Sequence, residues 1–198
     1  MDNYQIITNH FHSAIEMIAL SADELAGNIE QASNQLIAAL IADARILVCG
    51  NGSDGAIAQL FVSNLLAQYD SERPPLPAIA LGCDPHTLTA ITQTSNPDDI
   101  YARQLRALGQ PGDVLLCIAS HQASNTLKMA IVAAHERNMQ CILLSNGASE
   151  LLELVGEQDT AIEFSCSDRA ATLELQLMTL NAICKLIDNG LFGSFSTE

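Results

Sequence analysis

The 198-residue sequence predicts an α/β protein in which helices cover both faces of a five-stranded parallel sheet. Two observations predict this class. Short apolar runs alternate with longer segments of helical periodicity, and the glycine-rich turn Gly50–Gly55 joins the first run to a helix. Parallel strands need crossovers, which are usually helical. The length suits one domain, with a helical segment at 1–43, an α/β core at 44–192 and a tail at 193–198.

Two helices are predicted before the first strand, separated near Gly27. Their apolar residues recur at the three- and four-residue spacing of one helix face. The first set is Tyr4, Ile7, Phe11, Ala14, Ile15 and Ile18, and the second is Ile29, Ala32, Leu36, Ala39 and Leu40.

The remaining chain alternates between strands and helices. The predicted strands are 45–49, 77–81, 113–118, 140–145 and 160–164; the predicted helices are 55–69, 85–94, 98–108, 124–138, 149–154 and 168–190. Asp84 and Asn96 each precede a proline, which favours a helix start at both positions. Asp70, Glu72 and Arg73 are interpreted as a solvated charge cluster.

The last predicted helix carries a heptad-like apolar seam and further apolar residues on its other faces. The seam consists of Leu173, Leu177, Leu180, Cys184, Ile187 and Leu191. A helix that is apolar nearly all round is buried, so we expect one face to meet the sheet and another a second subunit. The alternative is the core helix of a monomer.

The charge balance restricts the classes of partner. The net charge of −15 argues against direct contact with nucleic acid or an anionic membrane and favours a basic or neutral protein partner. Alternatively, the charge only maintains solubility. No apolar run has the length of a bilayer span, and the segment before Arg45 is unlike a signal peptide, so we expect a soluble, cytoplasmic protein.

The six cysteines stand singly, without a C-x-x-C pair, which predicts buried, reduced thiols rather than disulfides or a zinc site. They are Cys49, Cys83, Cys117, Cys141, Cys166 and Cys184. His135, near the end of a predicted helix, is given a structural role there.

A ligand cleft is expected beyond the carboxyl ends of the strands. The backbone N–H groups of the glycine-rich turn, together with the helix dipole behind them, favour an anion such as a phosphate. The candidate ligand-binding residues are Gly50, Asn51, Gly52, Ser53, Ser120 and Ser124.

Three runs of sequence carry a family resemblance: Cys49–Ser53, Arg73–Leu81 and Arg106–Leu116. With them the chain resembles the SIS (sugar isomerase) domain family, in the branch that holds phosphoheptose isomerases and DnaA initiator-associating proteins. The resemblance spans essentially the whole chain, including Leu186–Phe192. It implies a flavodoxin-like five-stranded sheet and a homotetramer.

The resemblance also implies that the isomerase chemistry is missing. Members that isomerise heptose phosphates carry proton-transfer and metal-binding residues at positions that match Leu60, Asn64, Leu173 and Asn181 in this chain. Leucine cannot bind a metal, and an asparagine amide is no base near neutral pH. Gln68 stands where isomerases have an arginine. We therefore expect no catalytic residue, no metal ligand and no cofactor.

The phosphate site is altered in the same comparison. Asp54 matches the family's phosphate-binding serine, and its carboxylate opposes a phosphate dianion. In the second loop, Gln122 replaces the family's glycine, whereas Ser120 and Ser124 remain as hydroxyl donors and His121 can supply a charge when protonated.

The expected function is an oligomeric protein-binding scaffold. In initiator-associating members a leucine–phenylalanine pair after the last helix binds the replication initiator DnaA, and the matching pair here is Leu191–Phe192. Alternatively, these two residues fold back onto the core or the subunit interface. The competing functions are a phosphoheptose isomerase with a rearranged site and a sensor that binds a sugar phosphate or nucleotide without converting it.

Overall fold

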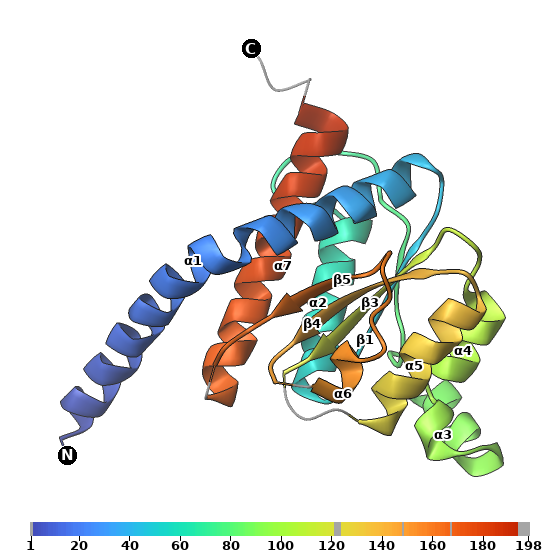
Figure 1. The fold of residues 1–198 in the computed structure, drawn as a ribbon, viewed down its shortest axis with the longest axis horizontal. Coiled ribbons are helices and arrows are strands. Elements are labelled where there is room, and N and C mark those ends of the chain that lie inside the picture. Colours follow the sequence, from blue (N-terminus) through green and yellow to red (C-terminus); the bar gives the residue numbers. More distant parts are fainter. Residues whose placement is uncertain (1, 121–123, 148, 167, 194–198) are drawn as a thin grey trace.

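A five-stranded parallel sheet forms the centre of the molecule (Figure 1). The computed structural model describes residues 2–120, 124–147, 149–166 and 168–193. The strands are β1 (Ile46–Gly50), β2 (Ala78–Ala80), β3 (Val114–Ala119), β4 (Gln140–Ser145) and β5 (Thr160–Glu163). Their order, β2-β1-β3-β4-β5, is that of a flavodoxin-like sheet, which confirms the predicted fold class.

Helices cover both faces of this sheet (Figure 1). They are α1 (Asn3–Ile41), α2 (Ser53–Leu66), α3 (Pro85–Thr94), the 3-10 helix η1 (Pro97–Asp99), α4 (Ala102–Leu108), α5 (Asn125–Glu136), α6 (Ser149–Leu152) and α7 (Arg169–Phe192). Strand side chains alternate between two buried clusters: Ile46 and Val48 pack with α1, α2 and α7, whereas Leu47 and Cys49 pack with α4 and α5. This alternation is the pleat period of a strand buried on both faces.

The two predicted N-terminal helices form one continuous helix, α1. Gly27 lies inside it, with no atom within 4 Å of the place where a Cβ would be. A single glycine costs a helix only about 1 kcal/mol relative to alanine, and buried Leu25 and Leu36 anchor the helix on either side of it. The N-terminal half of α1 extends away from the sheet (Figure 1).

The last helix, α7, is a core helix. Among the described helices it alone is long and apolar enough to cross a membrane. Of its predicted seam, however, Leu180, Cys184 and Ile187 are buried in the cluster formed with α1 and α2. Met178 and Leu186, on other faces, remain exposed.

Cysteine chemistry follows the prediction of reduced thiols, because all six cysteines are free. Four are buried and Cys166 is half-buried. Cys83 is exposed, which corrects the expectation that all are buried. It lies between β2 and α3, whereas the four buried cysteines lie in β1, β3, β4 and α7.

Arg73 is not part of a solvated charge cluster, which corrects the sequence interpretation. Its side chain is 1% exposed, and its Nε donates to Asp188 Oδ1 of α7 over 2.6 Å. The guanidinium also donates to the carbonyl oxygens of Leu65 (2.9 Å) and Asn64 (2.8 Å). These carbonyls lie in the last turn of α2, where the Leu65 carbonyl also accepts the N–H of Leu76. Arg73 therefore caps α2 and ties it to α7.

We expect the substitution Arg73→Met to lower the free energy of unfolding by about 3–5 kcal/mol, because it leaves Asp188 as an uncompensated buried charge. Urea unfolding followed by circular dichroism measures the change. The control is Arg106→Met, which removes a solvent-exposed pair with Glu136 and is expected to have little effect. Equal losses in the two variants would contradict the capping role.

Candidate functional site

A cavity of about 350 Å3 opens at the carboxyl ends of β1 and β3. Its lining residues are Asn51, Gly52, Asp54, Ala119, Ser120, Ser124, Leu127 and Arg169. The strand order reverses here, because β2 lies on one side of β1 and β3 on the other. Ligands of open α/β sheets bind at such a switch point. Four predicted candidates, Asn51, Gly52, Ser120 and Ser124, therefore share one cavity.

Close backbone contacts shape the turn between β1 and α2. A Cβ at Gly50 would lie 2.7 Å from the carbonyl carbon of Asp54, and one at Gly55 would lie 2.9 Å from the carbonyl oxygen of Gly50. Gly52 adopts φ +59°, in the left-handed region that favours glycine. The turn thus requires glycines, and it places Asp54 in the first turn of α2, at the positive end of the helix dipole.

Asp54 provides an internal anion in this cleft. Its side chain is buried, and its Oδ2 accepts the backbone N–H of Ser120 over 2.9 Å. Within the described part of the chain, its Oδ1 and the hydroxyl oxygen of Ser120 are buried without a hydrogen-bond partner. A backbone donor of the second loop is therefore already satisfied by a carboxylate, and a second anion placed here meets like charge.

A polar network joins the two loops that border the cavity. Asn51 Nδ2 donates to the hydroxyl oxygens of Ser124 (2.7 Å) and Thr126 (2.9 Å). Ser124 is also the N-cap of α5 and accepts from the N–H of Leu127. The Tyr101 hydroxyl donates to the carbonyl oxygen of Gly50 over 2.7 Å. The hydroxyl of Ser124 thus has a structural role that the sequence did not reveal.

The pKa values of two buried groups beneath the cleft, Tyr101 and Cys117, are raised. Desolvation, then the neighbouring Cys49 and Cys117, raises the pKa of Tyr101 well above its usual value. The pKa of Cys117 is also raised, first by its hydrogen bond with Cys49 and then by burial. These groups remain protonated near neutral pH, so neither offers a nucleophile.

Arg169, the first residue of α7, is a functional candidate that sequence reasoning missed. Its Nη2 donates to the hydroxyl oxygen of Ser53 over 2.7 Å, so α7 supplies a cation to the rim of the cavity. The available signal was the N-cap residue Asp168, which starts a helix after the last strand, at the edge where the cleft lies. His121 and Gln122 lie outside the described residues.

Four positions were matched to isomerase catalytic residues through the family resemblance, and they lie outside the lining of this cavity. They are Leu60 and Asn64 on α2 and Leu173 and Asn181 on α7, and none lines the cavity. Leu60 is exposed, and the other three are half-buried.

Leu191 and Phe192 end α7 in an intermediate environment. Both are half-buried and pack against the core cluster of α1, α2 and α7. Phe192 also borders a surface cavity of about 420 Å3, with acidic neighbours Asp70, Glu72 and Asp188. Each side chain of the pair is thus partly packed against the core and partly accessible to a partner.

Together, the sheet order, the glycine turn and the cavity at the switch point define an open α/β protein with a cavity at the sheet edge where ligands of such folds lie. The SIS domain model matches residues 9–146, and the chain belongs to the SIS domain family.

Relatives from two functional groups cover nearly the whole chain. A phosphoheptose isomerase of Chromohalobacter salexigens is 37% identical over 98% of this chain and 99% of its own length. The DnaA initiator-associating protein DiaA of Cronobacter sakazakii is 40% identical over 92% of this chain and 93% of its own length. The structure of a phosphoheptose isomerase from Francisella tularensis superposes with a TM-score of 0.89 and 33% identity, over 96% of this chain and 100% of that chain.

We expect the substitution Asp54→Ser to open the cleft to phosphate, because it removes the internal carboxylate while the helix dipole remains. Inorganic phosphate should stabilise this variant, by about 2.7 kcal/mol at 100 times its Kd, and leave the wild type unaffected. Thermal unfolding with and without phosphate measures the effect. Asp54→Asn separates removal of the charge from removal of bulk. Equal stabilisation of wild type and Asp54→Ser would contradict the role of Asp54.

Proposed function

We propose that this chain is an SIS-domain protein without isomerase activity, which works as an oligomeric protein-binding scaffold in the manner of its DiaA relatives. The observation that carries the proposal is the Asp54 carboxylate bound to the backbone N–H of Ser120 inside the cleft. An isomerase for a phosphorylated sugar needs that space for the substrate's phosphate, and it needs an acid and a base beside the reacting carbons.

The residues at the matched catalytic positions support this proposal. Leu60 and Leu173 have no polar side-chain atom, and the amides of Asn64 and Asn181 do not titrate. A fold does not carry its chemistry with it, so the same sheet can serve a non-catalytic role.

The partner that we propose is the replication initiator DnaA, bound in the cytoplasm. The cavity beside Phe192 combines its phenyl ring with the carboxylates of Asp70 and Glu72 and with Lys185, whereas Asp188 is already paired with Arg73. The remaining excess of negative charge favours a partner that offers an apolar contact and a basic group. The net charge of −15 favours the same kind of partner over nucleic acid.

Assembly into a homotetramer is the second part of the proposal. The projecting half of α1 presents Tyr4, Ile7, Phe11 and Ile15, each more than half exposed, along one helix face. An apolar stripe of this kind is stable in water only when another surface covers it. A second copy of the chain offers a matching stripe and the groove between α1 and α7. Several copies of one binding surface then raise avidity by effective concentration.

We expect the substitution Phe11→Glu to dissociate the oligomer, because it places a charge in the covered stripe. Size-exclusion chromatography with light scattering measures the mass. The matched control is Asn9→Glu, which lies on the opposite face of α1 and should keep the wild-type mass. Equal masses for all three proteins would contradict assembly through this stripe.

We expect the double substitution Leu191→Ala/Phe192→Ala to weaken binding to purified DnaA by about tenfold or more, because a pair of large apolar anchors dominates an interface. Pull-down and surface plasmon resonance measure the affinity. Leu108→Ala removes an exposed leucine on α4 and serves as control. Thermal unfolding must first show that the double variant is folded. Equal affinity of the folded variant and the wild type would refute this binding surface.

The competing function is a sugar-phosphate sensor, which the guanidinium of Arg169 at the cavity rim favours. A phosphorylated heptose that raises the unfolding temperature of the wild type, without turnover, would replace the scaffold proposal with this one.

A further inference from the structure

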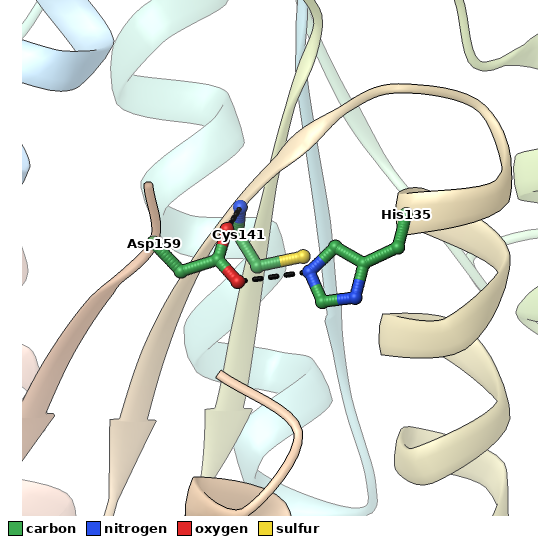
Figure 2. A group of neighbouring side chains, drawn as sticks. All are labelled: His135, Cys141 and Asp159. Carbon is green, nitrogen blue, oxygen red and sulfur yellow. Dashed lines mark hydrogen bonds and ion pairs between the residues drawn. The ribbon is translucent and has the colours of Figure 1, made fainter. Parts of the chain in front are cut away.

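Three side chains with metal-binding atoms meet at the amino ends of β4 and β5, the sheet edge opposite the cleft. His135 lies in the last turn of α5, Cys141 is the second residue of β4, and Asp159 directly precedes β5. Figure 2 shows the sulfur of Cys141 and the carboxylate of Asp159 directed at the imidazole of His135. The three ligand atoms lie within 4.8 Å of one another.

We propose that His135, Cys141 and Asp159 bind a divalent transition-metal ion of the zinc type, with water as fourth ligand. The set of donor atoms selects this class of ion. A thiolate and an imidazole disfavour magnesium and calcium, which take oxygen ligands, and favour zinc, cobalt and related ions. Three protein ligands of nitrogen, sulfur and oxygen type, with one open position, suit the tetrahedral geometry of zinc.

The carboxylate is already held in place by the backbone. Asp159 Oδ1 accepts the N–H of Cys141 over 2.7 Å, and Oδ2 accepts the N–H of Gly156 over 2.7 Å. Its side chain is only 4% exposed, so these bonds fix its orientation. Hydrogen bonds behind a ligating carboxylate are the usual support of a metal site.

The imidazole supplies both the second ligand and the route of entry. His135 Nε2 lies 2.8 Å from Asp159 Oδ2, which is a direct hydrogen-bond distance, so the two groups already meet and an ion would replace the hydrogen bond between them. The side chain of His135 is 37% exposed, whereas Cys141 is buried. An ion can therefore enter past the ring and reach the thiol behind it.

Charge and protons balance at the proposed site. The Cys141 thiol loses its proton to solvent, and a bond forms between the thiolate sulfur and the metal. The imidazole binds through Nε2 in its neutral form, so its hydrogen bond to Asp159 is exchanged for two metal–ligand bonds. One thiolate and one carboxylate then neutralise the two charges of the ion, which leaves a neutral complex in a largely buried place.

The test measures metal binding to the full, metal-free chain. We expect zinc chloride to bind in a 1:1 ratio by titration calorimetry and to raise the unfolding temperature, and cobalt(II) to give the thiolate-to-metal charge-transfer absorption. The substitution His135→Gln should weaken zinc binding about tenfold or more. Cys141→Ser should abolish the cobalt band. Cys83→Ser, which removes an exposed cysteine, should change neither.

Three outcomes would overturn the proposal. These are an absence of 1:1 binding by the wild type, full zinc affinity in His135→Gln, or loss of the cobalt band in Cys83→Ser. If Cys141→Ser fails to fold, His135→Gln still decides, because its partly exposed side chain tolerates replacement. The site lies at the opposite sheet edge from the cleft, so its failure leaves the scaffold proposal unaffected.

Discussion

The hydrogen bond from the Ser120 backbone N–H to the Asp54 carboxylate is the interaction on which the character of the cleft depends. The tight glycine turn after β1 points a helix N-terminus at the switch point, where the field favours an anion. In this chain the anion at that position is the side-chain carboxylate of Asp54. The Asp54 carboxylate therefore links the turn after β1 to the loop after β3.

The sheet and the cleft are physically separable, which explains how the site can change while the fold persists. Strand side chains alternate between two apolar clusters, and Asp54, Ser120 and Arg169 belong to neither. Two further apolar features are partly or largely exposed on the outside of the helices. They are the apolar stripe of α1 and the half-buried end of α7, and both suit contacts with other proteins.

Local sequence signals predicted the strands to within one or two residues at each end, because buried parallel strands are short apolar runs bounded by turns. The N-caps Asp84 and Asn96 were predicted from the proline that follows each of them. Contacts between distant residues were not predictable. Arg73 forms an ion pair with Asp188, which lies 115 positions away in the sequence, and Arg169 donates a hydrogen bond to Ser53. The break predicted at Gly27 was wrong, because the free-energy cost of one glycine in a helix is smaller than the stabilisation from the packing on both sides of it.

The measurement that tests the central claim most directly is turnover of a phosphorylated heptose by the purified chain, with divalent metal supplied and an isomerase relative as positive control. We expect no product above the uncatalysed rate, because the Asp54 carboxylate occupies the turn after β1 and the positions matched to the isomerase residues carry no acid–base pair. Turnover by the wild type at a rate comparable to that of the relative would contradict the claim.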